Sequence, residues 1–171
     1  MSQCVFPGSF DPITCGHLNL IERASVLFDR VMVTVMVNIA KKGVIPYNER
    51  VEIIRKACKH LENVQVDLWT GLLVDYMKEH PGWIVLRGVR NANEFEQEIN
   101  IADVNRRLLP GTETLLMPAS PEWNGISSSV IREIASFGGD FKAFVPKTVY
   151  RDIHKYLIPE SKGKGGNCHG K

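Results

Sequence analysis

Short apolar runs alternate with amphipathic stretches along this chain of 171 residues. The runs are short and rich in branched apolar side chains, which predicts β-strands. They lie at residues 4–6, 31–37, 64–68, 84–86 and 114–117. The second run, VMVTVMV, is apolar or β-branched at every position. Such a run is typical of a parallel strand that is buried on both faces.

The stretches between the runs repeat apolar residues at helical spacing, which predicts four helices. The apolar faces of the first three comprise Leu20, Ile21, Ala24, Leu27 and Phe28, then Val51, Ile54, Ala57, Cys58 and Leu61, then Leu72, Leu73 and Tyr76. The fourth, over about 92–109, places Phe95, Ile99 and Ala102 together and stops before Pro110. Two further helices are expected at 127–137 and 146–157.

This alternation predicts an α/β fold, a Rossmann-like doubly wound sheet of five parallel strands followed by C-terminal helices. Ligands of such sheets bind at the carboxyl ends of the strands. Polar loops follow four of the strands, at residues 7–17, 38–42, 87–90 and 123–129. We therefore expect these four loops to converge on one edge of the sheet.

Length and charge narrow the class of protein. The chain is long enough for one domain, which we place at residues 1–158, with a flexible Gly/Lys-rich tail at 159–171. A formal net charge of +2 argues against nucleic acid or an anionic membrane as a partner. No apolar run approaches the roughly 20 residues of a membrane span, and no signal peptide is visible. We expect a cytoplasmic protein.

The four cysteines have no spacing typical of a metal site or a disulfide framework. We expect Cys4 and Cys58 to be small core residues, because free cysteine is commonly buried. Cys15 lies two residues before His17. We expect Cys15 to take no chemical part.

The most informative segment is residues 7–17, PGSFDPITCGH, between the first predicted strand and the first helix. Gly8 and Gly16 allow a ligand to approach the backbone closely, and two prolines stiffen the loop. His17 falls at the start of the helix, where unpaired N–H groups and the helix dipole favour an anion. The segment therefore predicts a phosphate-binding loop.

The segment Thr14-x-Gly16-His17 resembles the T/HxGH motif of the nucleotidyltransferase superfamily, and residues 126–132, ISSSVIR, resemble its ISSTxxR-type counterpart. Together with the Lys41-Lys42 pair and the RGVR and WNGISSS segments at 87–90 and 123–129, they resemble the bacterial phosphopantetheine adenylyltransferases. The resemblance extends over roughly residues 4–158. It implies transfer of an adenylyl group from ATP to 4′-phosphopantetheine, with release of pyrophosphate and with Mg²⁺ bridging phosphates. It also implies a homohexamer.

The resemblance gives roles to individual residues. It makes His17, Lys41 and Arg90 catalytic. It assigns the acceptor to Ser9, Lys41, Leu73 and Arg87. It assigns ATP to Ser9, Phe10, His17, Gly88, Val89, Arg90, Glu98, Trp123, Asn124, Gly125, Ile126, Ser127, Ser128 and Ser129. The family more often has threonine at the position of Ser9, which keeps the hydroxyl and loses a methyl group. No protein metal site is implied.

Simpler interpretations stay open for several of these residues. His17 and Ser127 could act only as helix caps, and Lys41 could be a solvated loop residue. Leu73 could be plain core. Glu98 could be a surface carboxylate, as we expect for Glu94 and Glu96.

Two rival functions share the same fold. A related transferase could act on nicotinate mononucleotide or an alcohol phosphate, and Lys41, Leu73 and Arg87 are the positions that would discriminate it. A non-catalytic nucleotide-binding module would be expected to lack His17 or the serine run, and this chain has both.

Overall fold

The computed structural model describes residues 1–38 and 43–158; Lys41, Lys42 and the predicted tail lie outside the described residues. Five parallel strands form one sheet in the order β3-β2-β1-β4-β5. The strands are β1 (Gln3–Gly8), β2 (Arg30–Val37), β3 (Val64–Thr70), β4 (Ile84–Val89) and β5 (Thr114–Pro118). The predicted parallel sheet is confirmed, and four of the five strands extend beyond their apolar runs at the carboxyl end or at both ends.

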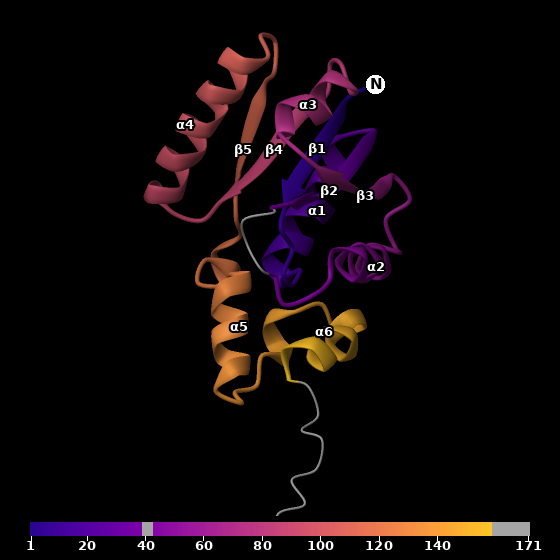
Figure 1. Ribbon diagram of the computed structural model, residues 1–171, viewed down its shortest axis with the longest axis vertical. Helices are drawn as coiled ribbons and strands as arrows, with labels where there is room; N and C mark the ends of the chain where they lie inside the picture. Colours follow the sequence, from indigo (N-terminus) through magenta and orange to yellow (C-terminus); the bar gives the residue numbers. More distant parts are fainter. Residues whose placement is uncertain (39–42, 159–171) are drawn as a thin grey trace, which may run out of the picture.

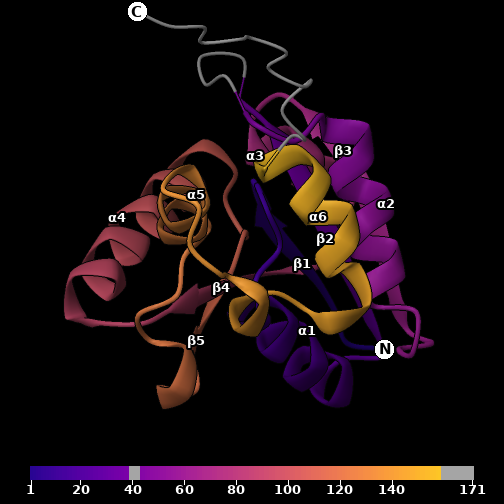
Figure 2. The ribbon, with the colours of Figure 1, turned by 90° about the horizontal axis from the view of Figure 1, so that it is seen from below.

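In the part of the chain that the structure describes, six α-helices connect and follow these strands. Their arrangement is shown in Figure 1. They are α1 (Cys15–Leu27), α2 (Tyr47–Ala57), α3 (Leu73–Lys78), α4 (Ala92–Leu108), α5 (Ser128–Ser136) and α6 (Tyr150–Leu157). The predicted helix at 146–157 begins as a separate 3₁₀ turn, Lys147–Val149. Seen from the α5 and α6 end, α2 and α4 lie at opposite sides of the sheet (Figure 2).

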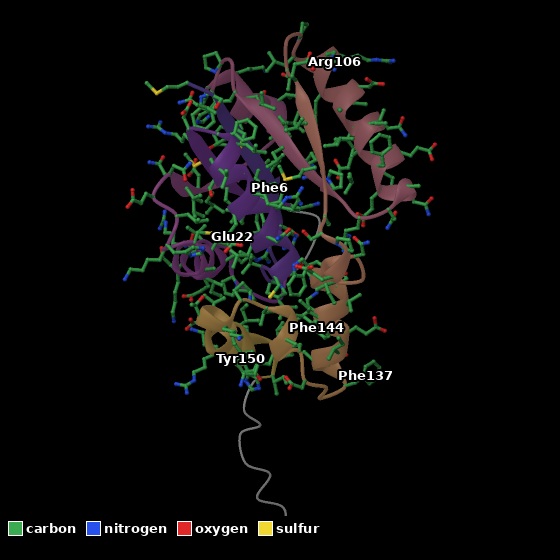
Figure 3. All side chains as sticks on the ribbon, turned by 180° about the vertical axis from the view of Figure 1, so that it is seen from behind. Phe6, Glu22, Arg106, Phe137, Phe144 and Tyr150 are labelled. Atoms are coloured by element: carbon green, nitrogen blue, oxygen red, sulfur yellow. The ribbon has the colours of Figure 1, made fainter. Side chains whose placement is uncertain are left out.

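The two faces of the sheet hold two separate cores, because successive side chains of a strand point to opposite faces. Cys4 and Phe6 of β1 pack into the larger core with α1, α2 and the C-terminal helices. Val5 points the other way, into a smaller core with Tyr76 and Met77 of α3. Phe6 lies near the middle of the molecule, whereas Phe144 and Tyr150 lie at the end formed by the C-terminal helices (Figure 3). Cys4 and Cys58 are buried, as predicted.

Three predicted helix faces differ from the structure. Leu27 is 61% exposed because α1 ends there and the chain turns toward β2. Leu72 is 59% exposed because it precedes α3 as its N-cap, and Val74 and Met77 take the buried positions instead. The apolar residues of α4 share a face, but α4 has no buried residue. Phe95 and Ile99 are 47% and 39% exposed.

The chain order reverses beside β1. From β1 the chain moves through β2 to β3, and then crosses to β4 and β5 on the other side. Connections on either side of such a point leave in opposite directions and open a crevice at the carboxyl ends of the strands. The loops after β1 and β4 border this crevice. Within residues 1–38 and 43–158, no helix is long and apolar enough to cross a membrane.

Candidate active site

His17 is fixed in the first turn of α1 by a reciprocal capping box. The Thr14 hydroxyl oxygen accepts a hydrogen bond from the His17 backbone N–H at 3.2 Å. In return, Nδ1 of His17 accepts from the Thr14 backbone N–H at 3.1 Å. The rings of Phe10 and Phe6 pack edge-on against the imidazole, at centroid distances of 5.1 and 6.4 Å. The ring therefore has one orientation.

Burial and nearby charges determine whether His17 is protonated, and its hydrogen bond with Thr14 determines the tautomer. Burial lowers the pKa of the imidazole to about 4, and the positive charges of Arg90 and Arg87 act in the same direction. The ring is therefore neutral near pH 7. Because a backbone N–H can only donate, Nδ1 has no proton, and the proton lies on Nε2. His17 thus offers a neutral N–H donor to a ligand.

Two cavities meet at this histidine. The smaller, of about 350 Å³, lies between β1, β4, α4 and the 3₁₀ turn Pro121–Trp123, and Trp123, Ile126 and Glu98 line it. The larger, of about 780 Å³, reaches Leu73 of α3 and Arg132 of α5. Among the residues that the structure describes, six line both cavities: Pro7, Gly8, Ser9, His17, Arg87 and Arg90. A ligand in one cavity would therefore face a ligand in the other across His17.

Two glycines let the walls of the smaller cavity pack closely against each other. A side chain at Gly88 would collide with Leu20 of α1. One at Gly16 would lie 3.3 Å from Cβ of Trp123, tighter than ordinary contact. Both positions therefore depend on a missing side chain, which allows β4 and the Trp123 turn to approach α1 closely.

Arg87 and Arg90 line both cavities from the carboxyl end of β4. Arg87 donates from Nε and Nη2 to the two oxygens of Glu98, at 2.7 and 2.6 Å. Arg90 is held in the same way by Glu94, with Nε donating at 3.0 Å. Both carboxylates come from α4. The sheet edge thus presents two cations, each with a fixed partner.

Asp11 joins four segments beneath the larger cavity. Its carboxylate is buried and accepts from the backbone N–H groups of Val44 and Ile45, at 3.0 and 2.9 Å. Arg50 of α2, 3% exposed, lies 3.4 Å from the same carboxylate and donates to the Ser9 carbonyl at 2.9 Å. Arg132 of α5 donates to the Asp11 carbonyl oxygen. We call Asp11, Arg50 and Arg132 the Asp11 frame.

The three serines before and in the first turn of α5 line the larger cavity. Ser127 is the N-cap and accepts from the Val130 N–H at 3.2 Å. The Ser128 hydroxyl donates to the Pro12 carbonyl at 2.7 Å, so its one proton already has an acceptor. The Ser129 hydroxyl accepts from Arg132 at 3.1 Å, so all three hydroxyls have contacts within the protein. The start of α5, where the first backbone N–H groups lack intrahelical acceptors, also lies at this cavity.

Most of the predicted site residues come together here, and some do not. The two cavities are lined by Ser9, Phe10, His17, Leu73, Arg87, Gly88, Arg90, Glu98, Trp123, Ile126, Ser127, Ser128 and Ser129. Val89 is buried in β4, and Asn124 and Gly125 are exposed; among the described residues these three line neither cavity. Lys41 lies outside the described residues.

The expectation that Glu94 is a surface carboxylate is wrong. It is half-buried, lines the smaller cavity and binds Arg90. The sequence signal was its spacing of four residues from Arg90, across the start of α4. Glu96 is exposed, as predicted. The Asp11 frame was also missed, because its members are far apart in the sequence and only the fold brings them together.

The described residues contain no group of three His, Cys, Asp or Glu side chains that could hold a metal ion. The two carboxylates at the smaller cavity are already bound to arginines.

Comparison with known proteins identifies the family of the chain. The cytidylyltransferase-like family model matches residues 5–134. The phosphopantetheine adenylyltransferase of Clostridium botulinum is 44% identical over 153 residues, covering 90% of this chain and 96% of that protein. The enzyme of that name from Crocosphaera subtropica is also 44% identical, covering 89% of this chain and 97% of its own length.

Solved structures show the same fold at low identity. A bifunctional NMN adenylyltransferase/ADP ribose pyrophosphatase from Francisella tularensis has a TM-score of 0.71 and 14% identity, covering 93% of this chain. This chain spans 50% of that protein's length. A second structure of that protein contains AMP and a manganese ion, with a TM-score of 0.69. By the sequence matches, the chain belongs to the cytidylyltransferase-like family and, within it, to the phosphopantetheine adenylyltransferases.

Proposed function

We propose that the protein transfers the adenylyl group of ATP to 4′-phosphopantetheine, giving dephospho-coenzyme A and pyrophosphate. The observation that supports this most directly is the meeting of two cavities at His17, which suits two phosphate-bearing substrates. The names of relatives that are 44% identical over almost their whole length specify the acceptor.

The reaction needs no covalent intermediate on the protein. A phosphate oxygen of the acceptor attacks the α-phosphorus of ATP, and the bond from that phosphorus to the bridging oxygen of pyrophosphate breaks. The attacking oxygen is already ionised, since the second pKa of a phosphate monoester is about 6. No general base is required. The protein has to align the two substrates and stabilise negative charge.

His17 fits that need as a hydrogen-bond donor. With its pKa near 4 it is a neutral imidazole whose Nε2–H can donate to an oxygen of the α-phosphate. Its orientation by Thr14 and Phe10 exists before the ligand binds, so no reorganisation is required during the reaction. We assign the nucleoside and the α-phosphate to the smaller cavity, beside Trp123 and Ile126. The larger cavity takes the acceptor, toward Leu73, and also the terminal phosphates of ATP, toward Ser127.

In this proposal the two arginines bind different substrates. We assign Arg90 to the nucleotide phosphates and Arg87 to the acceptor phosphate, while the helix start at Ser127 receives the terminal phosphates of ATP. Ser9 lies on both cavities and would contact both substrates. Lys41 is assigned to the acceptor phosphate from the family resemblance alone.

We propose that Mg²⁺ enters with ATP, as part of the substrate, and bridges its phosphates. The fold neighbour from Francisella tularensis, which was solved with AMP and a manganese ion, supports this assignment.

We also propose a cytoplasmic homohexamer. The family resemblance suggests the number of subunits, and the exposed apolar side chains on α4 support an interface between copies. They are Phe95, Ile99, Ile101, Val104 and Leu108. Sedimentation equilibrium would measure the assembly, and a monomer at micromolar concentration would contradict it.

Pyrophosphate release tests the function. The protein, supplied with MgATP, should release pyrophosphate when 4′-phosphopantetheine is added and not when nicotinate mononucleotide replaces it. The matched control is His17→Ala, which should be nearly inactive with the same acceptor. Equal turnover with nicotinate mononucleotide would refute the assigned acceptor.

A further inference from the structure

The two arginines at the end of β4 are held by an identical pattern of contacts. In each, Nε and Nη2 donate to the two oxygens of one carboxylate, and Nη1 donates to a backbone carbonyl. For Arg87 that carbonyl belongs to Pro7, at 2.7 Å, and for Arg90 it belongs to Ile126, at 2.8 Å. A guanidinium has five N–H groups, so three are used and one remains on each terminal nitrogen.

Glu94 makes more contacts than a carboxylate in the first turn of a helix needs. Asn91 already caps α4 by accepting from the Glu94 N–H at 3.0 Å. In a capping box, the glutamate would turn back to the N-cap residue. Here its Oε2 instead accepts from both the backbone N–H and Nε of Arg90, at 2.9 and 3.0 Å. Both carboxylate oxygens of Glu94 thus accept hydrogen bonds from Arg90.

Glu94 is ionised at neutral pH. Partial burial raises the pKa of Glu94, but its hydrogen bonds with Arg90 and the charge of that arginine together lower it below the ordinary value. The carboxylate and the guanidinium therefore form an ionised bidentate pair, the strongest and most directional kind of side-chain hydrogen bonding.

We propose that Glu94 is a positioning residue that fixes Arg90 so that its two remaining N–H groups face the phosphates of the nucleotide. This inference rests on the proposed function, in which Arg90 binds those phosphates. Glu94 itself would not touch the nucleotide phosphates, because both of its oxygens are occupied by Arg90. Its contribution passes through the arginine.

The direction of the change in ATP affinity distinguishes this positioning role from a simple effect of charge. Removing a negative charge beside a phosphate site would by itself tighten ATP binding, because ATP is an anion. Loss of orientation would weaken ATP binding instead. Glutamine at position 94 tests the two effects, because an amide nitrogen cannot accept from Nη2 of Arg90.

The experiment is a double-mutant cycle on the equilibrium binding of MgATP, measured by calorimetry for the full chain. Glu94→Gln should raise Kd about tenfold, within the usual range for directly coupled residues. In the Arg90→Ala background the same substitution should leave Kd unchanged or lower it, because the carboxylate then has no arginine to orient. The control Glu96→Gln makes the same charge change at an exposed position of α4 and should leave Kd unchanged.

Two results would overturn the proposal. One is an unchanged or tighter Kd for Glu94→Gln in the wild-type background. The other is an equal loss in both backgrounds, which would mean that Glu94 acts without Arg90, for example through the stability of α4. Thermal unfolding of each variant checks that the fold is retained. Because the measured quantity is nucleotide binding, failure to adenylylate 4′-phosphopantetheine would refute the proposed function and leave this test valid.

Discussion

The Asp11 frame and the arginine pairs of α4 hold charges at the same edge of the sheet in different ways. Asp11 and Arg50 are 8% and 3% exposed, and the frame joins the loop at residues 9–11 to α2 and, through Arg132, to α5. Arg90 and Glu94 are 31% and 27% exposed and lie four residues apart. α4 itself has no buried residue, and at its far end Arg106 pairs with exposed Glu113 (Figure 3).

The difference indicates two separate tasks. Burying charges is costly unless each is paired and hydrogen-bonded, so the Asp11 frame is tolerated only in one arrangement. It fixes the shape of the loop before His17. The pairs on α4 are partly solvated, so each carboxylate orients its arginine at a lower cost in desolvation and leaves N–H groups of the arginine open to a phosphate.

The largest expected effect on stability comes from breaking the frame. Asp11→Ala leaves Arg50 buried without its carboxylate and two backbone N–H groups without acceptors. We expect a loss of about 3–5 kcal/mol in the free energy of unfolding, as for other broken buried pairs. Urea denaturation measures it. Glu94→Ala, the matched change on α4, should cost less than about 1 kcal/mol. Similar losses for the two variants would contradict the proposed difference between the Asp11 frame and the arginine pairs of α4.

The next effect concerns catalysis rather than folding. His17→Ala removes a donor that we place on the transition state, so kcat should fall about 100-fold or more, as when an oxyanion-hole donor is lost. Affinity for ATP should change much less, because ground-state binding is not what is removed. Steady-state kinetics with both substrates measures the two quantities. Near-normal kcat with weak ATP binding would make His17 a simple ligand contact.

A smaller but direct effect is the titration of His17. Its imidazole should stay neutral with the proton on Nε2 from pH 8 down to about pH 5, and protonate near pH 4. Nitrogen NMR of the imidazole ring observes both the tautomer and the midpoint. The pKa is lower in the folded than in the unfolded chain, so this residue reduces stability as pH falls from about 6.5 toward 4. A midpoint at 6.5 or above would contradict the neutral state of His17 near pH 7.

The sequence predicted the sheet well because buried parallel strands have a strong local signal. The second run, for example, reads as a strand without any tertiary information. The face of α3 was harder, since a helix of six residues has too little periodicity to separate Leu72 from Val74. Leu27 failed for a similar reason, because helical spacing does not indicate where α1 stops packing.

The same difference between local and long-range signals decides which site residues could be predicted. His17 and the serine run were visible because they lie in short local motifs next to a predicted strand or helix. Arg50 was not, because its partners Ser9 and Asp11 are about forty positions away and only the fold joins them. Glu94 was treated as one of several surface carboxylates on α4. Its distance of four residues from Arg90 was the local clue.

The smallest effect is expected at Cys15. Burial raises the pKa of this thiol, and its Sγ lies 3.8 Å from the Ala143 carbonyl oxygen, so it is a poor nucleophile in a structural position. Cys15→Ser should keep most of the activity in the pyrophosphate assay. An inactive but folded Cys15→Ser protein would indicate an adenylylated thiol and contradict direct transfer.

Direct transfer between the two cavities is the central claim, and stereochemistry at phosphorus tests it most directly. ATP that is chiral at the α-phosphorus should give dephospho-coenzyme A with net inversion, because one in-line displacement inverts the configuration once. A covalent intermediate on any residue of the protein would require two displacements. Net retention would therefore contradict the account, and net inversion is the result that it predicts.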